Sequence, residues 1–285
     1  MNENLPLPTP AINSWLDEAT SELRAIGIPT AQLDAELILA HTLRKSRTYL
    51  HAHQDDALTD REREIADARL SLRLERVPVA YIIGHKEFYG RKFRVTSATL
   101  IPRPESESLI ELLRHALPST ARLLTDDPLR LVDVGTGSGI LGITAKLVFP
   151  ELEVTLADVS RHALKIAEQN ARDLKAEVTI LQSDLLTNYP FTADVIIANL
   201  PYVDPEWERS PETDHEPELA LFARNKGLAL ILELLIQSRD RLVQGGHLIL
   251  EADPEQHPAI ITEAKQQGLL LQETDGYGLL LQKLK

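Results

Sequence analysis

From Leu129 to the end of the chain, short apolar segments alternate with longer stretches whose apolar residues recur at helical spacing. Strands that alternate with helices form βαβ units, and a series of such units builds a mainly parallel sheet with helices on both faces. The last two segments are joined only by residues 275–278, which leaves no room for a crossover helix, so these two must be antiparallel. The sequence therefore predicts a doubly wound α/β sheet with an antiparallel edge. Its seven predicted strands are Leu131–Val134, Val154–Ala157, Val178–Leu181, Val195–Ala198, His247–Glu251, Leu269–Glu273 and Leu279–Gln282.

The region before this sheet has a different pattern. From Ile12 to Arg76 the apolar residues recur at helical spacing, which predicts a small helical domain over residues 1–76. Residues 77–100 contain aromatic and β-branched residues, Tyr81 to Ile83 among them, that are separated by glycines, a pattern typical of a β-hairpin. We therefore expect a hairpin linker over residues 77–100 and the α/β domain over residues 101–285.

The composition excludes several kinds of chemistry. The chain has no cysteine, which excludes disulfides, thiolate metal sites and a cysteine nucleophile. Its nine histidines show no metal-ligand spacing, so we predict no metal site. With 30 Lys and Arg against 43 Asp and Glu, the net charge of −13 disfavours a dedicated nucleic-acid binder. Since neither a secretory signal nor an apolar run of about 18 residues is present, we expect a cytoplasmic protein without membrane contact.

A glycine-rich loop follows the first predicted strand. Residues 133–139 read Asp-Val-Gly-Thr-Gly-Ser-Gly, and a helix is expected to begin near Ile140. Glycines at the carboxyl end of a strand allow a sharp turn and let a ligand lie against bare backbone. The spacing fits neither the dinucleotide nor the P-loop pattern. It is the D-x-G-x-G-x-G pattern typical of class I S-adenosylmethionine methyltransferases, and a glycine-rich turn without a ligand is the alternative.

The next two strand ends carry matching chemistry. Asp158 can accept hydrogen bonds from both hydroxyls of a ribose, Asp184 can accept one from an adenine amino group, and Leu185 can pack on the ring. A carboxylate at a strand end is often only a helix cap, but three successive strand ends with the expected chemistry favour a cofactor site. The predicted cofactor is S-adenosyl-L-methionine, with S-adenosyl-L-homocysteine as product. Its predicted binding residues are Asp133, Gly135, Thr136, Gly137, Ser138, Gly139, Asp158, Asp184, Leu185 and Asn199.

The fourth predicted strand runs into Asn199-Leu200-Pro201-Tyr202. Planar amide and amine nitrogens are poor nucleophiles, so methyl transfer to them depends on positioning and electrostatics. The side-chain oxygen of Asn199 and the backbone carbonyl of Leu200 can accept the two N–H groups of such a nitrogen, and Tyr202 can lie over it. A simple turn is the alternative for this tetrapeptide. Its position after a full cofactor signature favours an active site, with Asn199, Leu200, Pro201 and Tyr202 as the predicted catalytic residues.

The chain resembles the HemK family of protein-(glutamine-N5) methyltransferases over nearly its whole length. Beyond the two loops, residues 33–41, 78–84, 87–90 and 215–217 are similar to the family's other motifs, and residues 100–107 resemble the segment that closes over the cofactor. The resemblance implies a class I methyltransferase, Rossmann-like fold preceded by a helical domain and a hairpin. It also implies methyl transfer to the glutamine of the Gly-Gly-Gln loop in peptide chain release factors.

The resemblance also predicts which residues bind the protein substrate. The resemblance adds Arg103 and Glu105 to the acceptor loop as substrate-binding residues, and Arg103-Pro104-Glu105 looks more like the release-factor branch than the branch that modifies a ribosomal protein. We hypothesise that the helical domain recognises the substrate. The alternatives are a ribosomal-protein glutamine methyltransferase, an N6-adenine or N4-cytosine nucleic-acid methyltransferase, and, because of Leu200, a non-catalytic protein that binds S-adenosylmethionine. The oligomeric state stays open, with a monomer as the default.

Two positions depart from the family pattern, and one group of charges has two interpretations. Leu200 replaces the usual first proline of Asn-Pro-Pro-Tyr, which frees one backbone φ angle, and Asp253 replaces an expected glycine. Arg69, Arg73 and Arg76 fall on one predicted helical face. A solvated helix face is favoured for them over a contact with an acidic partner or RNA.

Overall fold

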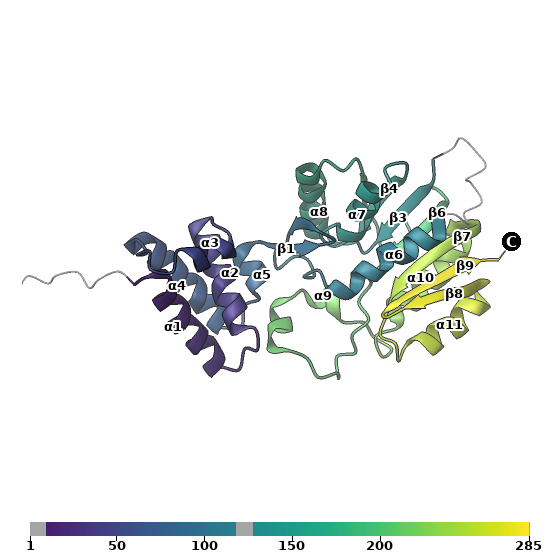
Figure 1. Ribbon diagram of the computed structural model, residues 1–285. Helices are drawn as coiled ribbons and strands as arrows, with labels where there is room; N and C mark the ends of the chain where they lie inside the picture. Colours follow the sequence, from purple (N-terminus) through teal and green to yellow (C-terminus); the bar gives the residue numbers. More distant parts are fainter. Residues whose placement is uncertain (1–9, 118–127, 285) are drawn as a thin grey trace, which may run out of the picture. The chain divides into compact units, whose positions relative to one another are not determined.

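The computed structural model describes residues 10–117 and 128–284 (Figure 1). The chain divides into two compact units, of which the first comprises the residues up to Gly84 together with Pro211–His215. The second comprises His85–Ser210 and Glu216–Lys285. Within the described ranges, no helix is long and apolar enough to cross a membrane.

The first unit is helical, as the spacing of its apolar residues predicts. Its longest helix begins with a capping box, in which Thr59 accepts a hydrogen bond from the amide of Glu62 and the Glu62 carboxylate accepts one from the amide of Thr59. Trp15, Leu23 and Ile38 belong to the apolar core that the helices share. The elements of this unit are α1 (Ile12–Ala25), α2 (Ala31–Leu43), α3 (Arg47–Ala52), α4 (Asp60–Leu74), α5 (Val79–Ile83) and the 3-10 helix η4 (Pro211–His215).

The arginine face of α4 is not a solvated surface, so that prediction was wrong. Arg73 is 4% exposed, and its guanidinium donates to Asp34 at 2.7 Å and to Glu212 at 3.0 Å. Arg76 also donates to Glu212, at 3.1 Å, and Arg69 donates to the hydroxyl of Thr42 at 2.8 Å. A buried charge needs an opposite charge beside it. These partners come from distant parts of the chain, where local charge patterning cannot reveal them.

The hairpin is shorter than predicted. Pro78 precedes the helix α5, and Gly84, with a φ of 75°, ends it, so Tyr81–Ile83 are helical and their assignment to the hairpin was wrong. The hairpin itself pairs β1 (His85–Phe88) with β2 (Arg91–Arg94) in antiparallel register. It belongs to the second unit.

The second unit is built on a seven-stranded sheet with the order β5-β4-β3-β6-β7-β9-β8 (Figure 1). The neighbours from β5 to β7 are parallel, whereas β9 is antiparallel to both β7 and β8. The predicted doubly wound sheet with an antiparallel edge is confirmed, and the last strand inserts between β7 and β8. The strands are β3 (Arg130–Val134), β4 (Glu153–Asp158), β5 (Thr179–Gln182), β6 (Ala193–Ala198), β7 (Leu242–Glu251), β8 (Leu269–Asp275) and β9 (Gly278–Lys283).

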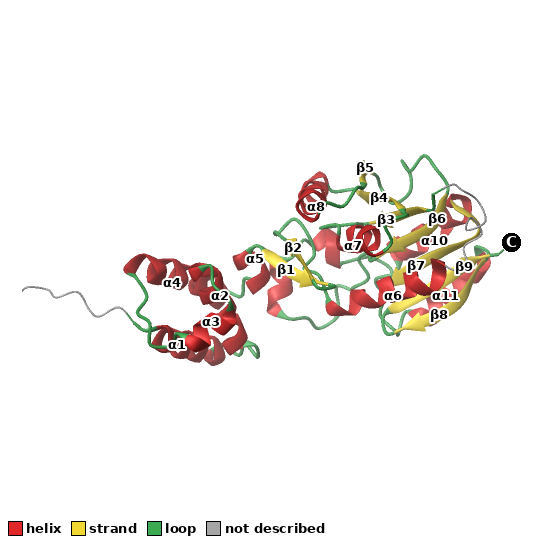
Figure 2. Cartoon of the chain, turned by 45° about the horizontal axis from the view of Figure 1, so that its top comes forward, coloured by secondary structure: helices red, strands yellow, loops and turns green. Residues whose placement is uncertain are grey.

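Helices cover both faces of this sheet (Figure 2). Successive side chains of a strand point to opposite faces, so Leu131 packs in the core beneath α6, α7 and α8, whereas Val132 packs in the core beneath α10 and α11. The two apolar layers explain why the central strands read as continuous hydrophobic runs. The remaining elements are η1 (Pro104–Ser106), α6 (Glu107–Ala116), α7 (Ile140–Val148), α8 (Arg161–Leu174), α9 (Glu218–Leu221), α10 (Ala229–Arg241) and α11 (His257–Gln266).

Candidate active site

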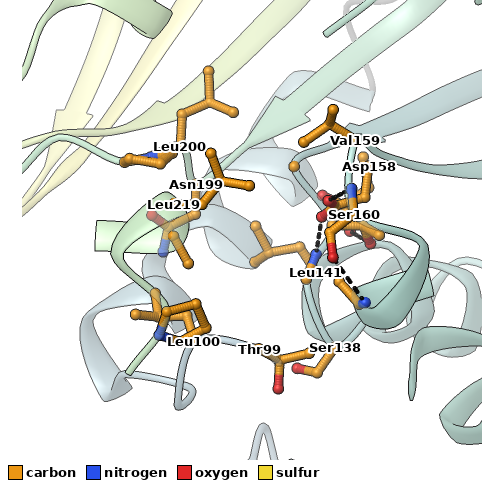
Figure 3. A pocket seen from close by; sticks show the side chains of 18 of the residues that line it. Thr99, Leu100, Ser138, Leu141, Asp158, Val159, Ser160, Asn199, Leu200 and Leu219 are labelled. Carbon is orange, nitrogen blue, oxygen red and sulfur yellow. Dashed lines mark hydrogen bonds between the residues drawn. The ribbon is translucent and has the colours of Figure 1, made fainter. Parts of the chain in front are cut away.

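A cavity of about 340 Å³ lies at the carboxyl ends of β3, β4, β5 and β6. This is the edge where ligands bind in open parallel sheets, and the volume falls within the range of small-molecule sites. Figure 3 shows Asp158 and Ser160 on one side of the cavity and Asn199 and Leu219 on the other. The predicted site residues that line it are Arg103, Asp133, Gly135, Thr136, Gly137, Ser138, Asp158, Asp184, Leu185, Asn199, Leu200 and Pro201.

Three predicted site residues are not among the described lining residues. Gly139 has a φ of 86° and is the N-cap of α7, where its backbone freedom lets the helix begin. Glu105 lies exposed in η1, and its backbone carbonyl accepts a hydrogen bond from Ser108. Tyr202 directs its hydroxyl toward Glu251, at 3.0 Å.

The glycine-rich loop is held by the side chain of Asp133. One carboxylate oxygen accepts from the hydroxyl of Thr136 at 2.6 Å and from the amide of Gly142 at 2.8 Å, and so ties the loop to α7. Asp133 is 1% exposed, and burial raises its pKa to about 7 although both hydrogen bonds oppose the rise. Its role in the described structure is to shape the loop.

The carboxylate of Asp158 also takes part in shaping the loop. One oxygen accepts from the amide of Gly137 at 2.9 Å and the other from the amide of Ser160 at 2.8 Å. Burial raises the pKa of Asp158, and these backbone hydrogen bonds oppose the rise. The amide of Val159 is a third backbone donor to this carboxylate, and because a carboxylate has about four lone-pair sites, acceptor capacity remains for a ligand in the cavity that Asp158 lines.

The loop after β5 brings Asp184 and Leu185 to the same cavity. Leu185 has a φ of 46°, which is rare for a residue with a branched side chain and costs free energy. The side chain of Leu185 is 8% exposed and packs in the apolar core beside Tyr189. The strained backbone therefore places one apolar side chain at the wall of the cavity.

The acceptor loop follows β6. The side-chain nitrogen Nδ2 of Asn199 donates to the hydroxyl oxygen of Ser106 at 3.0 Å. Asn199 lines the cavity together with Leu200 and Pro201. Burial raises the pKa of the Tyr202 phenol, and the neighbouring Glu251 adds to the rise.

Leu200 explains how the loop accommodates the missing proline. Its side chain is 4% exposed and fills the space that a Cβ atom on Gly135 would need, since its Cδ2 would lie 2.8 Å from that atom. The leucine thus packs the acceptor loop against the glycine-rich loop. Asp253, the second departure, has no positive φ angle, so a glycine is not required there.

The segment over residues 100–105 is anchored by Glu216. The Glu216 carboxylate accepts from the backbone amide of Ile101 at 3.0 Å and pairs with the guanidinium of Arg103. Glu216 is 5% exposed. Arg103 and Pro217, which follows Glu216, both line the cavity.

Sequence reasoning missed three residues that support the acceptor loop, one of which, Ser106, also lines the cavity. Ser106 and Glu251 contact its side chains, and Gln256 donates to the backbone carbonyls of Tyr202 at 2.8 Å and Lys226 at 2.9 Å. They lie between about 50 and 95 residues from Asn199 along the chain. The one available signal was an acidic residue at the end of an otherwise apolar strand, Glu251.

Comparison with known proteins agrees with this geometry. The family model of the PrmC N-terminal domain matches residues 14–84, and that of the methyltransferase small domain matches residues 111–213. The release factor glutamine methyltransferase of Koribacter versatilis (strain Ellin345) is 38% identical over 248 residues, covering 84% of this chain and 86% of the relative. The chain therefore belongs to the release factor glutamine methyltransferase family. The family member of Escherichia coli (strain K12) is 35% identical, covering 86% of this chain and 87% of the relative.

Solved structures share the methyltransferase fold. A methyltransferase from Pyrococcus furiosus has a TM-score of 0.53 and 18% identity, with 75% of this chain and 100% of that chain covered. A 16S rRNA methyltransferase of T. thermophilus in complex with AdoMet and guanosine has a TM-score of 0.50 and 16% identity, with 70% and 50% covered. At these low sequence identities, the two structures support the fold and nothing further. The membership in the family rests on the sequence relatives, which extend across both units.

Proposed function

We propose that this chain transfers a methyl group from S-adenosyl-L-methionine to the side-chain amide N5 of the glutamine in the Gly-Gly-Gln loop of peptide chain release factors in the cytoplasm. The observation that carries the proposal is the position of Asn199. Its amide lies at the wall of the cavity that the glycine-rich loop and Asp158 also line. The membership in the family supports the release factor as substrate.

The cavity fits the proposed cofactor in shape and in donor chemistry. A Cβ atom on Gly137 would meet only the carbonyl oxygen of Gly135, at 4.0 Å, so bare backbone faces open space there. Asp158 offers acceptors for ribose hydroxyls, and Asp184 lies at the next strand end along the same wall. When bound, S-adenosyl-L-methionine supplies an electrophilic methyl group on a sulfonium.

The acceptor loop would orient the nitrogen that is methylated. Because Nδ2 of Asn199 donates to Ser106, the side-chain oxygen Oδ1 is the atom available to accept an N–H of the target amide. The backbone carbonyl of Leu200 would accept the second N–H. Two fixed acceptors hold the nitrogen in line and stabilise the positive charge that develops on it.

A transfer assay with radiolabelled S-adenosyl-L-methionine tests the proposal. The protein is incubated separately with a release factor, with the same factor whose loop glutamine is changed to alanine, with a ribosomal protein and with DNA. We expect label on the unmodified release factor alone. Label that persists on the alanine form would refute the assignment to the loop glutamine, and label on ribosomal protein or DNA alone would replace the release factor by that substrate.

A further inference from the structure

Glu251 is a buried carboxylate directly behind the acceptor loop. Parallel pairing of β6 with β7 sets Ala198 opposite Leu250, so the next residues, Asn199 and Glu251, leave the sheet side by side. Glu251 is 1% exposed, and its Oε1 accepts from the hydroxyl of Tyr202 at 3.0 Å. It is not among the described residues that line the cavity.

No basic side chain of the described residues forms an ion pair with Glu251. Burial raises the pKa of Glu251, whereas hydrogen bonds from Ser106, Tyr202 and Asn199 lower it. Its second oxygen, Oε2, is fully buried and meets no donor at good hydrogen-bonding geometry, although Ser106 and Asn199 lie close by. A buried carboxylate without a basic partner costs free energy, and here only hydrogen bonds from neighbouring side chains offset that cost.

The donors and acceptors around Glu251 have a single consistent arrangement. A carboxylate can only accept hydrogen bonds, so the one proton of the Ser106 hydroxyl is the group that Ser106 can donate to Glu251, and Nδ2 of Asn199 also lies within reach of this carboxylate. The lone pairs of the Ser106 oxygen then accept from Nδ2 of Asn199, at 3.0 Å. An asparagine amide can otherwise flip, because its oxygen and nitrogen have nearly the same shape. The chain Glu251–Ser106–Asn199 removes this freedom and leaves the oxygen of Asn199 to face the cavity.

We propose that Glu251 is a positioning residue that acts through Ser106 to fix the amide orientation of Asn199 and through Tyr202 to hold the acceptor loop. This inference rests on the proposed function, because the orientation matters only if Asn199 accepts an N–H of the substrate. With the amide reversed, the N–H groups on Nδ2 of Asn199 would face the N–H groups of the target amide, and two sets of donors cannot form a hydrogen bond. S-adenosyl-L-methionine would be held mainly by the glycine-rich loop and Asp158. Ser106 and Asn199 line the same cavity, so breaking this chain of hydrogen bonds should change the cofactor affinity much less than kcat.

The test compares E251Q, S106A and the double variant with the wild type. Glutamine keeps the shape of Glu251 but adds a donor, which removes the fixed polarity. We expect kcat to fall by about tenfold to a hundredfold in each single variant. The KM for the release factor, the Kd for S-adenosyl-L-methionine and the Tm should change little. The double variant should be about as slow as the slower single variant, since both changes break one chain.

D194N is the matched control. Asp194 is another fully buried carboxylate, located at the opposite end of β6, and it accepts from the backbone amide of Arg130 at 2.9 Å. A loss of kcat in D194N equal to that in E251Q would reduce the effect to general damage and overturn the proposal. The proposal also fails if E251Q has wild-type kcat. It fails as well if the loss of kcat in the double variant equals the product of the losses in E251Q and S106A. If E251Q does not fold, wild-type kcat in S106A overturns the proposal instead.

The wild-type reaction separates this inference from the proposed function. If the wild-type protein labels no release factor, the proposed function fails whatever the variants do. If it labels the loop glutamine and the variants turn over at the wild-type rate, only the positioning role of Glu251 fails.

Discussion

The two polar atoms of the Asn199 side chain have different partners. Nδ2 is occupied by Ser106, and the oxygen is left for the substrate. We therefore predict that N199A lowers kcat by about a hundredfold or more, because an acceptor for the developing charge is lost. The Kd for S-adenosyl-L-methionine, measured by calorimetry, should stay within about threefold of the wild type. If the cofactor affinity of N199A falls as far as its kcat, the main role of Asn199 is instead the cofactor binding that the sequence also predicts for it.

Leu200 stabilises the contact between two loops by packing. We predict that L200A lowers the free energy of unfolding by about 2–4 kcal/mol, because a leucine that is 4% exposed leaves a void above Gly135. L219A is the matched control. Leu219 lines the same cavity but is 66% exposed, so its truncation should cost less than about 0.5 kcal/mol. Urea unfolding of both variants measures the difference, and equal losses would show that Leu200 does not brace the loop.

Residues that carry a local signal were predicted from the sequence, and residues that act through distant partners were not. The acids at strand ends predicted Asp158 and Asp184, the Asn-Leu-Pro-Tyr motif predicted Asn199, and all three line one cavity, where their roles stay predictions. Ser106 and Glu251 were missed, because their importance comes from contacts 93 and about 50 residues away along the chain. A single serine or glutamate belongs to no local sequence pattern from which such a distant contact can be predicted.

At the scale of elements, the loop before α10 supports the acceptor loop by close packing. A Cβ atom on Gly227 would lie 1.9 Å from the carbonyl oxygen of Tyr202 and 2.6 Å from Nε2 of Gln256. We predict that G227A pushes the acceptor loop out of place and lowers kcat by about tenfold or more. Steady-state transfer to the release factor measures this loss.

G268A is the control for that prediction. Gly268 also has a positive φ, 75°, but nothing lies within 4 Å of its Cβ position. Alanine at residue 268 should cost roughly 1–2 kcal/mol of stability for its left-handed backbone and leave kcat unchanged. If both variants keep the wild-type kcat, the packing at Gly227 is not needed for the acceptor loop.

The secondary structure was easiest to predict where apolar runs are long. All seven strands of the sheet overlap their expected positions, although β7 begins at Leu242 rather than His247. A central strand such as β6 is buried along its whole length and so needs a continuous apolar segment. The sequence over Val79–Ile83 is equally apolar and β-branched, yet it is a helix. Pro78 and Gly84 decide this, since proline starts and a left-handed glycine ends a single turn, and a short apolar run does not itself distinguish helix from strand.

At the scale of the whole molecule, the buried acids of the second unit respond to pH in the opposite way to Glu36 and Glu62 of the first. The second unit's less buried acids Glu111 and Asp240, by contrast, also have lowered pKa values. In the second unit burial raises the pKa values of Asp133, Asp158 and Glu251. Their contribution to stability is full below the ordinary pKa of an unfolded carboxyl and is lost as the pH rises through their folded pKa values, about 7 for Asp133. His247, whose pKa burial lowers to about 4, offsets part of this trend.

In the first unit the shifts have the other sign. Burial raises the pKa of Glu36, but hydrogen bonds from Arg47 and Gln32 outweigh it, and hydrogen bonds from Thr59 lower the pKa of Glu62. A lowered carboxyl pKa contributes stability above its ordinary value, 4.5, that is lost as the pH falls through the folded value. The first unit should therefore weaken in acid, and the second should weaken toward neutral pH.

We predict that between pH 5 and pH 7.5 the second unit loses stability while the first stays nearly constant. The two tryptophans allow a separate measurement, because Trp15 lies in the first unit and Trp207 in the second. Urea unfolding followed by fluorescence in W207F reports the first unit, and W15F reports the second. D133N removes the group whose pKa is raised from 3.8 to about 7, so the unfolding free energy of W15F should vary less with pH, by a few kcal/mol. An unchanged slope in W15F carrying D133N would mean that Asp133 stays ionised in the folded protein, with its charge stabilised by the hydrogen bonds from Thr136 and Gly142.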